Sequence, residues 1–305
     1  MDTATTADAF ERAGWPQARP ITDGDRDQFV AVCQGSPIRE LLLSEVDSRS
    51  AAAFRYLSSE GITATAPSWG IVDVGWYGNL QESLGRILSP AGVPAPSGLY
   101  IGMMPGAVPC TFGSRRSFLF DSVGGFGRYS DIPDRFGHMV EMFCAGTEGV
   151  CLGYSGSDLV RPVLREARNE KALAWGTGLV HETVGLFADH VAAAITPDDL
   201  VVGSSHAVDA VAREFWLNPS ASEARDWGDF PFETNQEGGG EFRIAPELNV
   251  ASVLNSLLTG RPRASGEHWA AGMHRRSSAH LRALVRASQR ARALAGKLRR
   301  AARRR

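Results

Sequence analysis

The sequence predicts an α/β protein with a mostly parallel sheet flanked by helices, plus a basic C-terminal helix. Residues 70–74 form a short apolar run, and a turn containing Gly75 and Gly78 leads from it into an apolar stripe at helical spacing. A second apolar run at residues 98–103 completes a β-α-β unit, and such units build parallel sheets. The basic helix is indicated by twelve positive charges and no acid between Arg275 and Arg305.

The composition is that of a globular protein with a sizeable core. The chain has 305 residues, of which 43% are hydrophobic and 22% are charged. It has no run of about 18 apolar residues, so no membrane-spanning helix is expected, and residues 1–8 do not resemble a signal peptide. Four cysteines without C-x-x-C spacing are expected to be buried thiols in a reducing cytoplasm. The scattered histidines predict no metal cluster.

The elements before the first strand follow from their caps and apolar spacing. Thr22 and Asp23 are placed to cap a helix that runs past Val32. A second helix extends from Ile38 to Leu57, and Gly61 is placed to end it. Residues 1–20 are polar and are expected to form a flexible N-terminus. The expected domain order is therefore a flexible segment 1–20, an α/β domain 21–270 and a basic amphipathic helix or tail 271–305.

The elements after the β-α-β unit are predicted in the same way. Residues 104–130 are rich in glycine and are expected to be irregular. Ser220 and Glu223 form a capping box that begins a new helix. The remaining expected elements are a helix at 135–145, a strand at 150–154, a long helix at 170–194, a helix from Pro197, a loop at 229–240 and a helix at 250–258.

Asp73 is the leading candidate for a catalytic or ligand-binding residue. It ends the strand at residues 70–73, and the following helix directs its free N–H groups toward the same crevice. A carboxylate there can bind a sugar hydroxyl, hold a magnesium phosphate or act as a base; alternatively, it caps the turn. The predicted ligand-binding residues around it are Gly75, Trp76, Gly78, Asn79 and Gln81. Trp76 could instead anchor the core, and Gln81 could be a buried amide that joins two loops.

Glu141 is the second candidate catalytic residue. It lies on an otherwise apolar helix beside Met142 and Phe143. A partly buried glutamate has a raised pKa and can serve as an acid or a base. The alternative is a structural salt bridge.

The basic segment, residues 275–305, offsets most of the net negative charge of residues 1–274. Eleven arginines and one lysine lie between Arg275 and Arg305, which leaves 20 basic and 34 acidic residues in 1–274, a net charge of −14. Apolar residues recur at helical spacing among the arginines, a pattern typical of binding to an anionic membrane surface. The predicted membrane contacts are Arg286, Arg290, Lys297, Arg299 and Arg300. Nucleic-acid binding is a less favoured alternative, as is a disordered solubilising tail.

Residues 73–81 also resemble a D-x-G-W-x-G-x-x-Q signature. It occurs after the phosphatase-like domain in a group of bacterial haloacid-dehalogenase-type proteins that accompany glycosyltransferases of surface-polysaccharide assembly. Similar segments include Gly98–Gly102, Glu141–Cys144 and residues 215–232. The D-x-D-x-T nucleophile motif of the phosphatase half is absent: Asp23-Gly24-Asp25 has no strand before it and is better interpreted as a helix cap.

The resemblance implies a component of bacterial cell-surface polysaccharide biosynthesis that binds a phosphorylated or nucleotide-activated sugar. A sugar (phospho)transfer or hydrolysis without a cofactor is expected, with Mg²⁺ as the one alternative. The alternative is a non-catalytic, membrane-associated scaffold for glycosyltransferases. Both hypotheses place the chain in the cytoplasm, peripheral at the inner face of the plasma membrane.

Overall fold

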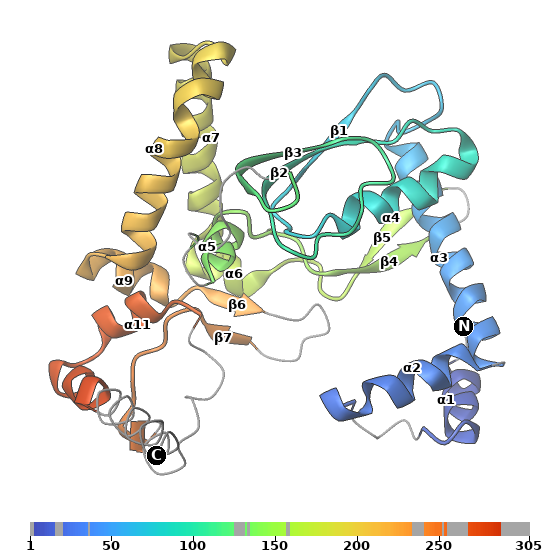
Figure 1. Ribbon diagram of the computed structural model, residues 1–305, viewed down its shortest axis with the longest axis horizontal. Coiled ribbons are helices and arrows are strands. Elements are labelled where there is room, and N and C mark those ends of the chain that lie inside the picture. Colours follow the sequence, from blue (N-terminus) through green and yellow to red (C-terminus); the bar gives the residue numbers. More distant parts are fainter. Residues whose placement is uncertain are drawn as a thin grey trace, which may run out of the picture.

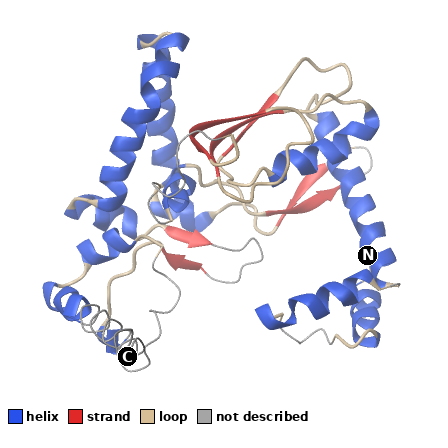
Figure 2. Cartoon of the chain, in the orientation of Figure 1, coloured by secondary structure: helices blue, strands red, loops and turns tan. Residues whose placement is uncertain are grey.

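The computed structural model describes residues 3–15, 21–35, 37–124, 132, 135–156, 159–233, 241–251, 253–254 and 268–287. It confirms the predicted class, an α/β protein in which helices flank a parallel sheet (Figure 1). Helices predominate over strands in the drawing by secondary structure (Figure 2).

The sheet contains three strands in the order β1 (Gly70–Asp73), β2 (Ser97–Met103) and β3 (Arg115–Asp121). Both neighbouring pairs are parallel. Helix α4 (Asn79–Leu88) connects β1 to β2, which confirms the β-α-β unit. Strand β3 lies in the segment that we expected to be irregular. Its residues alternate between the two faces of the sheet, but the glycines on both sides concealed this pattern.

One face of the sheet packs against α4, and the opposite face is largely exposed at β1 and β2. Tyr100 and Phe120 are buried on the covered side. On the open side Val72 is 80% exposed. The apolar character of residues 70–74 would indicate a buried strand, but no residue of β1 is fully buried, because β1 is an edge strand with only one covered face.

Three helices precede the sheet: α1 (Thr3–Arg12), α2 (Arg26–Gln34) and α3 (Ile38–Ser59). Helix α1 lies within the segment 1–20 that was expected to be flexible, and Trp15 beyond its end is buried and packs edge-on against Phe29 at 5.1 Å. A short 3-10 turn, η1 (Asp23–Asp25), precedes α2, and Thr22 forms a capping box with it. Asp23-Gly24-Asp25 therefore belongs to a helix cap, as predicted.

A second, two-stranded sheet lies against α3. Strand β4 (Cys151–Ser155) pairs antiparallel with β5 (Arg161–Leu164), and Tyr154 stacks on Tyr56 of α3 at 4.6 Å. Helix α5 (Phe136–Phe143) confirms the helix expected at 135–145. The cysteines differ from expectation: Cys110, Cys144 and Cys151 are exposed, and Cys33 is half-buried.

The long helix expected at 170–194 is two helices, α6 (Glu170–Trp175) and α7 (Thr177–Ala194). Gly176 separates them with φ 127, which an ordinary side chain rarely adopts. Helix α8 (Pro197–Leu217) runs back toward the core after α7, and both helices project from the rest of the molecule (Figure 1). Helix α9 (Ala221–Gly228) begins with the predicted capping box between Ser220 and Glu223.

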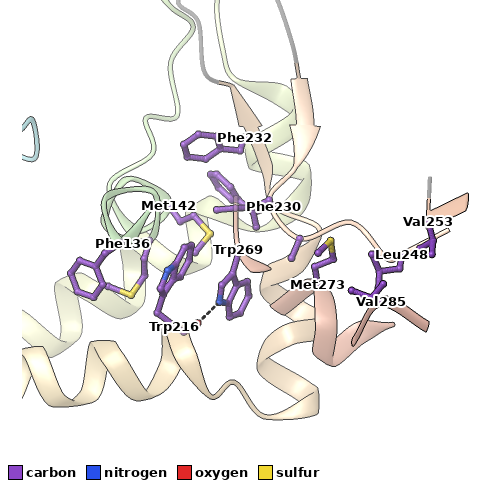
Figure 3. Packing of buried hydrophobic residues seen from close by; sticks show 13 residues of the cluster. Phe136, Met142, Trp216, Phe230, Phe232, Leu248, Val253, Trp269, Met273 and Val285 are labelled. Atoms are coloured by element: carbon purple, nitrogen blue, oxygen red, sulfur yellow. Dashed lines mark hydrogen bonds between the residues drawn. The ribbon is translucent and has the colours of Figure 1, made fainter. Parts of the chain in front are cut away.

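The main hydrophobic core joins α5, α8 and α9 to the C-terminal elements. These are β6 (Pro231–Glu233), β7 (Glu241–Arg243) and α11 (Ala270–Arg276). Trp269 is fully buried, and its indole N–H donates to the Trp216 carbonyl at 2.7 Å (Figure 3). Residues 250–251 and 253–254 are helical; the rest of the helix expected at 250–258 lies outside the described residues.

Part of the basic segment belongs to this core. Residues 279–287 are helical, and Val285 is only 1% exposed within the core cluster. The boundary that we expected at residue 270 therefore does not separate a globular domain from a tail, because Met273 and Val285 complete the core. Arg286 is exposed. Arg290, Lys297, Arg299 and Arg300 lie outside the described residues. No helix in the described part of the chain is long and apolar enough to cross a membrane.

Candidate functional site

The turn between β1 and α4 has the predicted geometry. Asp73 is the last residue of β1, and α4 begins at Asn79. The Asp73 carboxylate accepts the Gly75 N–H at 2.6 Å, which closes the turn. A Cβ at position 75 would lie 2.8 Å from that carboxylate, so a larger residue there would displace the Asp73 side chain from this contact. Asp73 therefore has the turn-capping contact that was the alternative to a ligand-binding role.

Gly78 has a left-handed backbone, with φ 76, at the start of α4. A Cβ there would lie 2.6 Å from the guanidinium carbon of Arg115. That guanidinium donates to the Gly78 carbonyl at 3.2 Å. Glycine at position 78 thus allows the close approach of a structural arginine.

Gln81 is completely buried beneath the sheet. Its amide nitrogen lies 3.0 Å, 2.8 Å and 3.1 Å from three carbonyl oxygens, those of Pro96, Phe112 and Ser114. Its oxygen accepts the Tyr100 hydroxyl at 3.0 Å and the Arg115 Nε at 3.3 Å. With these partners, Gln81 holds two loops to the sheet and has no group left for a ligand.

Glu82 completes this network and was not predicted from the sequence. It is 4% exposed, accepts the Thr111 N–H at 2.7 Å and pairs with Arg115 at 3.1 Å. Burial by itself would raise the pKa of Glu82, but the Thr111 and Phe112 N–H groups and the Arg115 charge lower it overall. Glu82 is therefore a buried, ionised and structural carboxylate.

Trp76 connects this turn to Glu141. Its ring stacks on Phe120 at 6.0 Å with an interplanar angle of 8°. A Cβ at Gly137 would lie 2.9 Å from the indole, so this glycine lets α5 approach Trp76. The Trp76 side chain also lies close enough to the Glu141 carboxyl group to lower its pKa. Burial raises the pKa of Glu141, and the effect of Trp76 offsets only part of the rise.

Glu141 lines a pocket of about 330 Å³. Val74, which follows Asp73, contributes to one wall, and Lys171 provides a positive charge. Phe230 and Phe232 are buried aromatic residues at the same pocket. The other lining residues are Cys144, Ala145, Gly146, Asn169 and Pro231.

The predicted site residues thus fall into two groups. Glu141, with Trp76 behind it, belongs to the pocket. Asp73, Gly75, Gly78 and Gln81 belong to the turn and the buried network, and Asn79 is exposed at the start of α4.

The sequence reasoning missed Lys171 and Asn169. One signal was available for Lys171, which is the single lysine in residues 1–274. Asn169 caps α6 by accepting the Ala172 N–H at 3.2 Å, and such a cap is common enough to conceal any further role.

A cluster of histidines lies next to this pocket. His268 is buried, and its Nδ1 accepts from the Arg135 guanidinium at 3.0 Å and lies 3.2 Å from Nδ1 of His138. Because His268 Nδ1 accepts, His138 must donate through its own Nδ1. Burial, with the charges of His138 and Arg135, lowers the pKa of His268 to about 4. The ring centroids of His138 and Phe232 are 4.6 Å apart, so the histidine cluster contacts the wall of the pocket.

The pocket is poorly suited to Mg²⁺. Among its lining residues only Glu141 carries a carboxylate, whereas Mg²⁺ favours several oxygen ligands. The described part of the chain contains no group of three or more histidine, cysteine, aspartate or glutamate side chains placed to hold a metal ion.

The chain is thus an α/β protein with a pocket near the carboxyl end of the parallel strand β1. The pocket contains one acidic side chain, Glu141, and one basic side chain, Lys171. Comparison with known protein families finds no family model that matches the chain, and comparison with curated proteins finds no match. The interpretation of the site therefore depends on its chemistry.

Proposed function

We propose that this protein binds a phosphorylated or nucleotide-activated sugar in the pocket beside Glu141 and acts in bacterial cell-surface polysaccharide biosynthesis. The observation that carries the proposal is that Glu141 and Lys171 line the same pocket. Glu141 is a carboxyl group with a raised pKa. The Lys171 ammonium would bind the phosphate. Phe230 and Phe232 would contact the sugar or the base.

The proposed reaction is a transfer or hydrolysis at the sugar phosphate. A carboxyl group with a raised pKa retains its proton closer to neutral pH, so Glu141 can donate it to the oxygen of the leaving group. The Trp76 indole beside Glu141 would help to position the carboxyl group for this step. Asp73 is a weaker candidate, because the Gly75 N–H already occupies its carboxylate and because Val74, rather than Asp73, lines the pocket.

A non-catalytic scaffold for glycosyltransferases is the second candidate. Helix α7 favours it, because Leu179, Leu186 and Phe187 are 70%, 66% and 67% exposed. Exposed apolar patches of this kind mark interaction surfaces. In both proposals the chain is cytoplasmic and peripheral at the plasma membrane, attached through its basic C-terminal residues.

Ligand-dependent stabilisation separates the two candidates. A panel of nucleotide sugars and sugar 1-phosphates would be screened by thermal shift against the wild type, Glu141→Gln, Lys171→Gln and Glu247→Gln. A ligand at 100 times its Kd stabilises by about 2.7 kcal/mol. We expect a shift for the wild type and for the control at exposed Glu247, and a much smaller one for the two pocket variants. Equal shifts in all four proteins, or none, would favour the scaffold.

A further inference from the structure

A second concave region, the arginine groove, lies between the α8–α9 junction and the C-terminal helices. It has a volume of about 890 Å³. Phe215, Leu217 and Pro219 contribute apolar surface on one side, while Arg275, Arg282 and Arg286 line the other. It shares no residue with the pocket beside Glu141.

The three arginines of the groove have no carboxylate partner among the described residues. Arg275 and Arg286 are exposed, and neither forms an ion pair with a residue that the structure describes. Arg282 donates one bond, from Nη1 to the His274 carbonyl at 3.4 Å, while its Nε is buried and has no partner. Arg276 in the same segment is different: it is bonded to Asp229 at 2.8 Å and to the Ala245 carbonyl at 3.0 Å.

The two glutamates in the groove already have other donors. Glu214 accepts from the Asn218 amide at 3.1 Å. Glu223 accepts the Ser220 N–H at 2.7 Å in the capping box of α9, and these contacts with Ser220 lower its pKa. Both carboxylates belong to the α8–α9 side and neither is ion-paired with a groove arginine among the described residues, so three guanidinium groups and two carboxylates line the groove, an excess of one positive charge.

A buried N–H without an acceptor costs free energy, and no described residue supplies an acceptor to the Arg282 Nε, which favours an acceptor from a bound ligand. Guanidinium groups match phosphate oxygens in both charge and geometry. We propose that the arginine groove is a second binding site, in which Arg275, Arg282 and Arg286 hold a phosphate group. The remainder of that ligand would lie on Phe215, Leu217 and Pro219. The phosphate can belong to a soluble ester or to a lipid headgroup.

The test uses the full chain and two probes, glycerol 3-phosphate in solution and vesicles of phosphatidylglycerol. The groove variant is Arg275→Gln/Arg286→Gln, in which both changed side chains are exposed, so folding is retained. The control is Arg39→Gln/Arg55→Gln, which removes the same charge from exposed positions on α3. Arg282→Gln is measured as a third variant, with circular dichroism to verify its fold.

We expect the groove variant to bind at least one probe about tenfold more weakly than the wild type, a difference of about 1.4 kcal/mol. The control should match the wild type. Weakened binding of glycerol 3-phosphate would identify a soluble ester as the ligand, and weakened binding of vesicles alone would identify a lipid headgroup. Equal losses in the groove variant and the control would overturn the proposal, because net charge alone would then explain binding. Absence of saturable binding to both probes would overturn it as well.

Discussion

At the scale of the residue, the side-chain amide of Gln81 is enclosed by three carbonyl groups, one hydroxyl and one guanidinium group. The sequence placed Gln81 on the first turn of α4 correctly but could not separate a ligand contact from a buried amide. The partners that decide the question come from residues 96–115, far along the chain. A polar residue on the first turn of a helix has the same local pattern in both roles.

Gln81→Ala should be strongly destabilising. The substitution leaves the Tyr100 hydroxyl and the surrounding carbonyl groups buried without partners, and each such group costs about 1–3 kcal/mol. We expect a loss of roughly 3 kcal/mol or more in the free energy of unfolding, measured by urea denaturation. Asn79→Ala, two residues earlier and exposed, is the control and should change stability by no more than about 0.5 kcal/mol. A tolerated Gln81→Ala would show that the buried network contributes little.

Glu141 should make stability depend on pH in a defined direction. Because burial raises its pKa in the folded state, the folded protein holds this proton at pH values where the unfolded chain has lost it. The stability contributed by Glu141 is therefore complete below the unfolded pKa and is lost as pH rises through the folded pKa. Glu141→Gln cannot ionise, so its stability relative to the wild type should increase as pH rises above the ordinary glutamate pKa of about 4.3.

Urea denaturation at several pH values measures this difference. Glu247→Gln removes an exposed carboxylate and serves as the control, with a difference from the wild type that stays constant across the range. A constant difference for Glu141→Gln as well would contradict the raised pKa. It would also remove the basis for Glu141 as a proton donor.

At the scale of the element, the β-α-β unit and most helices were predictable because their signals are local. Apolar spacing located α4, α5 and α8, and the capping box located α9. Strand β3 was missed because its stability depends on pairing with β2, which local sequence does not report. The break between α6 and α7 was missed because a glycine within a helical stripe resembles a tolerated helix residue.

Two glycines of this region should respond in opposite directions to alanine. Gly176 has φ 127, so Gly176→Ala should destabilise by about 1 kcal/mol or more through backbone strain. Gly185 lies within α7, and a Cβ there would meet nothing within 4 Å. Gly185→Ala should therefore stabilise by up to about 1 kcal/mol. Thermal and urea unfolding of both variants measure the effects, and the same sign for both would contradict the helix break at Gly176.

At the scale of the whole molecule, the basic C-terminal segment has two parts with different roles. Its charge pattern predicted an appended amphipathic helix. The structure instead directs Val285 into the core, and Ser277 accepts the Leu248 N–H at 2.9 Å. Sequence periodicity shows that a helix has an apolar face, but it does not show whether that face meets a membrane or the protein's own core. The same ambiguity applies to the exposed face of α7.

Two truncations separate these roles. Removal of residues 275–305 deletes Ser277 and Val285 and exposes the surface that they cover, so the truncated protein should be strongly destabilised or fail to fold. Loss of one buried aliphatic side chain alone costs about 2–5 kcal/mol, a large share of the usual stability of a domain.

Removal of residues 288–305 leaves Ser277 and Val285 in place and deletes Arg290, Lys297, Arg299 and Arg300. This shorter truncation should retain the melting temperature of the full chain but bind vesicles of phosphatidylglycerol more weakly. The difference from the full chain should shrink as salt rises, since each lost charge contributes about 1 kcal/mol at most near such a surface and is screened within about 8 Å. Co-sedimentation with vesicles and thermal unfolding measure the two effects, and the full chain on vesicles of phosphatidylcholine is the control. A stable protein lacking residues 275–305 would contradict the place of Val285 in the core, and undiminished vesicle binding without residues 288–305 would contradict their role as the membrane contact.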